Sequence, residues 1–542
     1  MNRAFAFFGT KTATFLCLIT AIISRVINVC FVSYVSNDKI ILALQSKSLL
    51  LGHGLSRPLY YLINLEVPVY DYTPMWPPGY PLLLAPLLKI FHYDVYWATL
   101  VLDIIISVAF ILIVRKLCRQ LDFPASVVNI ATLITGCFEY TFIHDSNPTD
   151  TISLALLLLG FISTIKLLIN KEFNKALLIK AGILLFLPCL FRYNYTPIVL
   201  MISGLILISG FIKKDALLKR KGWWLSFITA LLILSLFLIL KRSTGMMNYI
   251  METERGIFPE NIFHWFPVVP SSFINVAFLT SQLIQKINLP FNSSMLLLEI
   301  INVFILISLA LLFIYLLVKK RYFVHPSPFK WFLLLGFLTS LIIFLTLGAL
   351  SFTHQIQGKS INAPWNYVYE SRYYAFVYVF IQLSFLGLFS LNGRAVQKKF
   401  NKIIFWSCMG VLIIEIGHNI YFNTKVAFHY QEYKSRVFVE QENNYFHSLL
   451  SDLIKEYPGY EILVADPNDS YYYHMATYLG NKGIVDAGKL KTGQPLVKKN
   501  SILLLRLIDM QAGDYKNCLL GSNVTLIKKI NVFNYYLIVL HS

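Results

Sequence analysis

Four short polar segments carry the residues of this sequence that are best suited to chemistry. Each stands where a long apolar run begins or ends: VSNDKI with Asp38, HDSNPTD with Asp145 and Asp150, FRYNYT with Arg192, and NYVYESRYY with Glu370 and Arg372. A carboxylate in such a place can take a proton from a reacting hydroxyl. A guanidinium presents a planar fork of donors that matches a phosphate. These segments are therefore candidates for general-base catalysis and for phosphate binding.

Each candidate also has a simpler interpretation. Asp38 can be an ordinary solvated charge, and the segment around Asp150 has the pattern of a helix start, where a carboxylate complements the helix dipole. Helix capping explains only one of the two acids in that segment. Arg372 can snorkel to the membrane interface, pair with Glu370 or bind a lipid phosphate. The sequence alone leaves these three roles open.

The composition indicates a membrane protein. Of the 542 residues, 56% are hydrophobic and 14% are charged, whereas average proteins are about a quarter charged. The first apolar run is longer than that of a signal peptide and lacks a small-residue cleavage site, so we expect it to be retained. Runs of about twenty apolar residues predict about eleven membrane-spanning helices, at 12–35, 96–114, 124–142, 149–168, 177–191, 195–212, 222–240, 295–318, 331–350, 373–391 and 403–421.

The basic residues sort to alternate connections between these runs. One set of connections holds the clusters at 115–119, 166–180, 213–221, 319–330 and 394–402. Positive charge marks the cytoplasmic side, so we expect a cytoplasmic N-terminus, with 36–95, 242–294, 351–372 and the C-terminal tail facing outward. This bias explains most of the net charge of +19 and argues against nucleic acid as a partner.

The alternation requires that residues 79–92 do not cross the membrane. The segment GYPLLLAPLLKIFH is interrupted by Pro81 and Pro86. A run of about fourteen residues is too short to span and suits a helix that lies in the interface. We therefore expect an interfacial helix in the first outer loop.

The tail after residue 424 differs in composition. EILVAD, GIVDAG, SILLLRLI and VFNYYLIVL are short β-rich runs separated by turn-rich stretches, which predicts a small α/β domain at 425–542 behind a transmembrane domain at 1–424. No glycine-rich phosphate loop follows these runs, so no nucleotide site is expected. The seven cysteines form no CxxC pair and are expected to be buried free thiols.

The order of these features resembles the GT-C membrane glycosyltransferases. The likeness is to protein O-mannosyltransferases, lipid A aminoarabinose transferases and the bacterial family named after the lipopolysaccharide transferases of rhizobia. It covers about residues 1–425, and WPPGYP with its spacing from Asp38 is its most specific part. The other matching features are Arg25 in the first span, LLLGHGLS, the acids at 145 and 150, LFRYNY and ESRYY.

This resemblance implies an inverting transfer of a hexosyl or pentosyl group from a polyprenyl-phosphate donor. The acceptor would be a hydroxyl of a glycan, lipid or protein on the extracytoplasmic face of a bacterial inner membrane. No cofactor or metal is implied. The roles it assigns are proton acceptor for Asp38, orientation of acceptor or sugar for Asp145 or Asp150, phosphate binding for Arg372 and Arg192, and substrate binding for Trp76, Tyr80 and Glu370.

The sequence departs from this family at one position and leaves other functions open. Many relatives carry an Asp-Glu pair where this chain has Asn37-Asp38-Lys39, so the second acid is missing. A transporter or flippase of lipid-linked glycans is the main alternative, although such proteins often show repeated halves and no repeat is visible here. The second alternative is an O-antigen polymerase or ligase. Such a protein would place its key basic residues in one large outer loop between late spans, whereas the longest early loop of this chain holds Asp38 and WPPGYP. A non-catalytic assembly protein is the third alternative.

Overall fold

The computed structural model describes residues 7–31, 37–61, 64–71, 77–137, 148–244, 327–353, 374–390, 452–465, 501–508, 524–530 and 533–540, with isolated positions from 410 to 449. The chain divides into two compact units. The first comprises Met1–Val32, Met75–Pro77 and Asp103–Phe428, and the second comprises Ser33–Pro74, Pro78–Leu102 and His429–Ser542. Each unit is described by itself, and the domain boundary expected at 424/425 stays a prediction.

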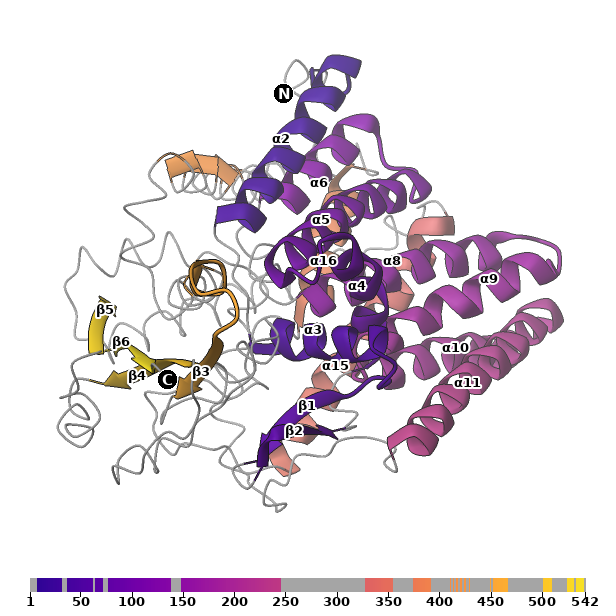
Figure 1. Ribbon diagram of the computed structural model, residues 1–542. Helices are drawn as coiled ribbons and strands as arrows, with labels where there is room; N and C mark the ends of the chain where they lie inside the picture. The colour runs from indigo at the N-terminus through magenta and orange to yellow at the C-terminus, as the bar shows by residue number, and fades with distance from the viewer. Residues whose placement is uncertain are drawn as a thin grey trace. The chain divides into compact units, whose positions relative to one another are not determined.

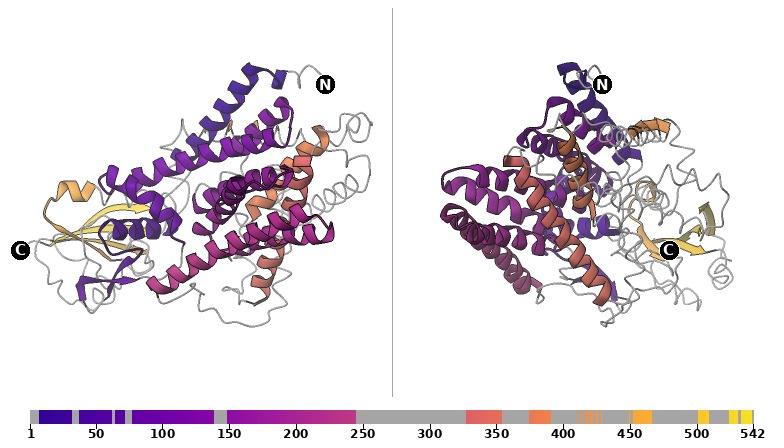
Figure 2. Two further views of the ribbon diagram at one scale, coloured as in Figure 1. Left: turned by 90° about the vertical axis from the view of Figure 1, so that its right-hand side faces the viewer. Right: turned by 180° about the vertical axis from the view of Figure 1, so that it is seen from behind.

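The first unit is a bundle of helices (Figures 1 and 2). Helix α5 begins in the second unit and continues into this one. The elements are α2 (Lys11–Phe31), α5 (Val95–Gln120), α6 (Ala125–Cys137), α8 (Pro148–Ile169), α9 (Lys175–Phe186), the 3-10 helix η2 (Leu187–Leu190), α10 (Tyr195–Ile212), α11 (Ala216–Thr244), α15 (Ser327–Thr353) and α16 (Ala375–Ser390).

Six of the described helices are long and apolar enough to cross a membrane. They cover Lys11–Cys30, Trp97–Gln120, Thr149–Ile169, Tyr195–Ile212, Ala216–Arg242 and Pro328–Thr346. Three further expected spans overlap the shorter helices α6, α9 and α16, of 13, 12 and 16 residues. The expected span at 295–318 lies outside the described residues, as does most of that at 403–421. The expected helical, polytopic membrane fold is confirmed.

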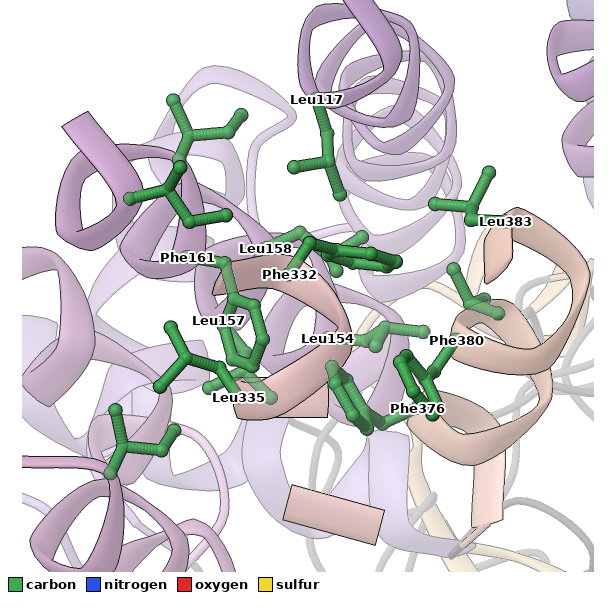
Figure 3. Close-up of a cluster of buried hydrophobic side chains, with 14 of the residues drawn as sticks. Leu117, Leu154, Leu157, Leu158, Phe161, Phe332, Leu335, Phe376, Phe380 and Leu383 are labelled. Atoms are coloured by element: carbon green, nitrogen blue, oxygen red, sulfur yellow. The ribbon is translucent and has the colours of Figure 1, made fainter. Parts of the chain in front are cut away.

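Helix α8 lies at the centre of this bundle. Some 78% of its apolar span is buried, against 28% for α11, which is therefore at the periphery of the bundle. Figure 3 shows the apolar side chains of α8 directed toward α15 and α16. The ring of Phe161 lies 6.4 Å from that of Phe332 on α15 and 5.3 Å from that of Phe376 on α16. This aromatic layer fixes α8 relative to α15 and α16.

Glycines allow several helix pairs to approach closely, as is common in membrane bundles. A Cβ atom added at Gly136 of α6 would stand 2.3 Å from the Cβ and 2.4 Å from the Cα of Ala21 on α2. A similar clash with backbone would arise at Gly222 of α11, 2.5 Å from Leu207 of α10. Gly204 of α10, in contrast, has no atom within 4 Å of such a Cβ.

These glycines yield a stability prediction. Gly136→Ala should destabilise the protein by about 1–3 kcal/mol because the backbone of α2 must shift. Gly204→Ala is the matched control, and it should leave stability unchanged or raise it because alanine favours helix. Thermal unfolding of both variants in one detergent measures the difference. Equal unfolding midpoints would show that the α2–α6 contact is looser than described.

A buried polar network ties α2, α5 and α6 together. The Nη1 of Arg115 donates to Oδ1 of Asn129 at 3.0 Å and to Oγ1 of Thr132 at 3.1 Å. The Nδ2 of Asn129 donates in turn to the carbonyl oxygen of Phe8 at 2.7 Å and to Oγ1 of Thr14 at 2.8 Å. Both side chains are buried, so each bond replaces one that water would otherwise supply.

The second unit contains most of the segment between the first two expected spans. Helix α3 (Asn37–Leu50) follows the first span and packs against α4 (Gly79–Ile90). Between them β1 (Arg57–Tyr61) and β2 (Asn64–Asp71) form an antiparallel hairpin. Helix α4 is the helix expected at 79–92, and its 12 residues cover about 18 Å at the usual rise, less than a hydrocarbon core. Helix α3 and the hairpin were not expected.

The tail of the second unit forms a four-stranded sheet of order β3-β4-β6-β5. Strand β4 (Ser501–Ile508) pairs in parallel with β3 (Glu461–Ala465) and antiparallel with β6 (Phe533–Leu540), which pairs with β5 (Val524–Ile530). The central strand is buried from 502 to 507, which explains its continuous apolar run. Three of the four expected strands are confirmed, the run at 483–488 lies outside the described residues, and β5 was not expected.

Candidate functional site

Two of the residues singled out in the sequence meet in the first unit. The Nη2 of Arg192 donates a hydrogen bond to Oδ2 of Asp150 at 2.6 Å, and the side chains are 13% and 6% exposed. A charge-assisted bond of this length is among the stronger polar contacts in proteins. The pair is therefore a fixed charged element inside a mostly apolar bundle.

Each partner is held by a local helix terminus. Asp150 lies in the first turn of α8, where it also complements the helix dipole. Arg192 lies in the turn that joins η2 to α10, and its backbone N–H donates to the carbonyl of Pro188 at 3.0 Å. The N–H of Tyr195 donates to the carbonyl of Arg192 at 3.2 Å. The two charges are thus positioned by backbone geometry and not by long loops.

The two residues after Arg192 add buried polar groups to this turn. The ring of Tyr193 stacks on that of Phe237 of α11, with centroids 6.0 Å apart and planes at 30°. Its hydroxyl and the Oδ1 of Asn194 are buried and have no hydrogen-bond partner in the part of the chain that is described. Burial raises the pKa of Tyr193 above its usual value, so the phenol is a neutral donor. Neither residue was singled out in the sequence.

The arrangement favours binding and orientation over proton abstraction by Asp150. The Oδ2 of Asp150 already accepts a hydrogen bond from the guanidinium of Arg192, so it is not free to take a proton from a reacting hydroxyl. A guanidinium carries five N–H donors, so it can hold a carboxylate and an anionic ligand at the same time. The pair is therefore suited to fix Arg192 as a site for negative charge.

The structure describes few of the other expected site residues. Asp38 lies in the first turn of α3 in the second unit, and Tyr80 is fully buried in α4, so stacking on a sugar would require its ring to move. Trp76, Asp145, Glu370 and Arg372 lie outside the described residues, and their roles stay predictions. Within the described ranges, no three His, Cys, Asp or Glu residues gather closely enough to hold a metal ion.

The ion pair gives a second stability prediction. Asp150→Asn should lower the free energy of unfolding by about 2–4 kcal/mol, because Arg192 would keep its charge in a buried place without a carboxylate. The double variant Asp150→Asn with Arg192→Gln should recover most of that loss. Chemical unfolding of the wild type, the two single variants Asp150→Asn and Arg192→Gln, and the double variant completes the cycle. Additive losses would show that the two side chains act independently.

Comparison with known proteins identifies the fold. No family model matches the sequence, and no curated protein sequence matches it. Solved structures that resemble the chain over most of its length are membrane glycosyltransferases of the GT-C fold, so the expected fold class is confirmed.

Among these structures is ArnT from Cupriavidus metallidurans, a lipid A aminoarabinose transferase. The apo structure of ArnT matches with a TM-score of 0.53 and 10% sequence identity, over 97% of each chain. The structure of ArnT bound to undecaprenyl phosphate matches with a TM-score of 0.51 and 10% identity, again over 97% of each chain. At this identity the likeness establishes the fold alone.

A weaker likeness extends to the oligosaccharyltransferase AglB from Archaeoglobus fulgidus. It has a TM-score of 0.43 and 13% identity, and it covers 93% of this chain and 69% of AglB. The assignment of the fold rests on ArnT and not on this match.

Proposed function

We propose that this protein is an integral membrane glycosyltransferase that uses a polyprenyl-phosphate-linked sugar. It transfers the sugar to an acceptor hydroxyl on the extracytoplasmic face of a bacterial inner membrane, with inversion at the anomeric carbon. The observation that carries the proposal is the fold likeness to ArnT over 97% of both chains. The ArnT structure with undecaprenyl phosphate supports a lipid phosphate as part of the donor.

The chemistry needs a base and a cation. A carboxylate must accept the proton of the attacking hydroxyl in the transition state, and we assign this role to Asp38 on α3. The departing lipid phosphate gains negative charge, which a prepositioned cation stabilises. We assign this role to Arg372, with Arg192 as a second cation whose orientation is supported by its bond to Asp150.

The most direct test is mass spectrometry of cell-envelope glycans from cells with and without this protein. The loss of one sugar mass from one class of glycan is expected. The isolated acceptor should gain the same sugar mass when purified protein is incubated with it and lipid-linked sugar in vitro, because transfer needs no other protein. Translocation of the lipid-linked sugar without transfer would instead support the flippase alternative.

Asp38→Asn should lower sugar transfer at least a hundredfold, because the amide cannot take the acceptor proton. The amount of folded protein in the membrane should stay the same. Asp122→Asn is the matched control, since Asp122 is exposed with a backbone φ of 60°, which asparagine tolerates. Full transfer by the Asp38 variant would refute its assignment as the base.

Arg372→Ala should weaken use of the donor more than use of the acceptor, because it removes a charge that contacts the phosphate. Steady-state kinetics with each substrate varied in turn would separate the two effects. Arg242→Ala, which removes an exposed cation at the end of α11, should change neither. An unchanged KM and kcat for the donor would leave Arg372 as a structural residue.

A further inference from the structure

The turn between η2 and α10 holds two buried polar groups to which the described part of the chain offers no partner. The hydroxyl of Tyr193 and the Oδ1 of Asn194 are both buried, and the described residues give neither a hydrogen-bond partner. Asn194 stands at the N-cap position of α10, yet its side chain makes no capping bond. Its backbone has the αR conformation, whereas a capping residue is usually extended. The amide oxygen therefore caps no helix and bonds to none of the described residues of the bundle.

Two buried polar groups without partners on consecutive residues lower the stability of the folded protein. A buried donor or acceptor without a partner costs about 1–3 kcal/mol, and Phe and Leu would fill the same space without that cost. The position of the phenol is well defined, because its ring is stacked on Phe237. A ligand that supplies hydrogen-bonding groups would remove the cost when it binds.

The chemistry of the two groups restricts this ligand. A carbonyl oxygen accepts hydrogen bonds and cannot donate them, so Asn194 Oδ1 needs a donor and repels a phosphate. A neutral phenol both donates and accepts, which matches a hydroxyl. The adjacent Arg192 carries the positive charge of the turn, held by Asp150. The turn thus presents a cation followed by groups that suit an alcohol.

We propose that Tyr193 and Asn194 form a subsite for the hydroxyl groups of the sugar in the lipid-linked substrate. This inference rests on the proposed function and adds to it the two residues that recognise the sugar. Tyr193 hydrogen-bonds one ring hydroxyl, and the amide oxygen of Asn194 accepts from a neighbouring one. Stereochemistry at these two carbons then decides which sugars bind, because an epimer leaves one group unpaired.

The test compares lipids with and without a sugar on the full-length protein in lipid nanodiscs. The probes are undecaprenyl phosphate alone and undecaprenyl phosphate carrying mannose, glucose or aminoarabinose, titrated by native mass spectrometry. Tyr193→Phe keeps the ring and its stacking and removes only the hydroxyl. Tyr421→Phe is the control, because Tyr421 is 63% exposed.

The sugar-bearing lipid that binds wild type best should bind Tyr193→Phe about three- to tenfold more weakly, the effect of one hydrogen bond. Undecaprenyl phosphate alone should bind both proteins equally, and the unfolding midpoint of Tyr193→Phe should be unchanged or higher. Asn194→Leu should show the same selective loss.

Three results would overturn the inference. Equal binding of the sugar-bearing lipid by wild type and Tyr193→Phe, with bare lipid still bound, refutes the subsite alone. A lower unfolding midpoint for Tyr193→Phe shows that the hydroxyl has a partner within the protein. Failure of wild type to bind any of the lipids refutes the proposed donor itself, and the subsite with it.

Discussion

A polar side chain inside an apolar helix bundle must find its hydrogen-bond partners within the protein, because the surrounding lipid offers none. Arg115, which is buried, and Arg192, which is 13% exposed, meet this requirement in different ways. Arg115 donates to the neutral oxygens of Asn129 and Thr132, and the network continues to the backbone of Phe8 and to the hydroxyl of Thr14 on α2. Arg192 donates to the carboxylate of Asp150. The first arrangement connects three helices, and the second fixes a charged pair at a helix junction.

Small and large side chains set the distances between the helices of this bundle. Gly136, Gly160 and Gly182 allow close contact between helices, since an added Cβ at each would meet the neighbouring helix within 3 Å. The aromatic side chains around Phe161 fill the wider space between α8, α15 and α16 (Figure 3). Close contact on one side and bulky packing on the other hold α8 in place, and with it the acid at its start.

Much of the fold follows from apolar length, but the pairing of the site residues does not. Runs of about twenty apolar residues identified every described helix long enough to span. Asp150 and Arg192 were each singled out by residue type and position, yet they are 42 residues apart and no sequence pattern links them. Tyr193 and Asn194 were missed because an aromatic and an amide in a loop give no sign of burial.

Strand β5 and helix α3 were not predicted because each lacks a clear apolar pattern. Strand β5, VTLIKKI, carries Lys528 and Lys529 and exposes Thr525 and Leu526, as an edge strand does, so its apolar signal is weak. Helix α3, NDKIILALQSKSLL, buries Lys39, Gln45 and two serines. Its polar residues do not sort to one face, and it therefore has no amphipathic period that would predict a helix.

The contact between Tyr193 and Phe237 also sets the depth of the turn. Phe237 lies seven residues before the end of α11 at Thr244, which corresponds to about 10 Å along the helix. The turn after η2 therefore lies below the C-terminal end of α11. The reason is length: α9 and η2 together are shorter than the 29-residue helix α11. At that depth ions of the bulk solution screen charge poorly. The attraction between Asp150 and Arg192 is consequently insensitive to the salt concentration of the surrounding solution.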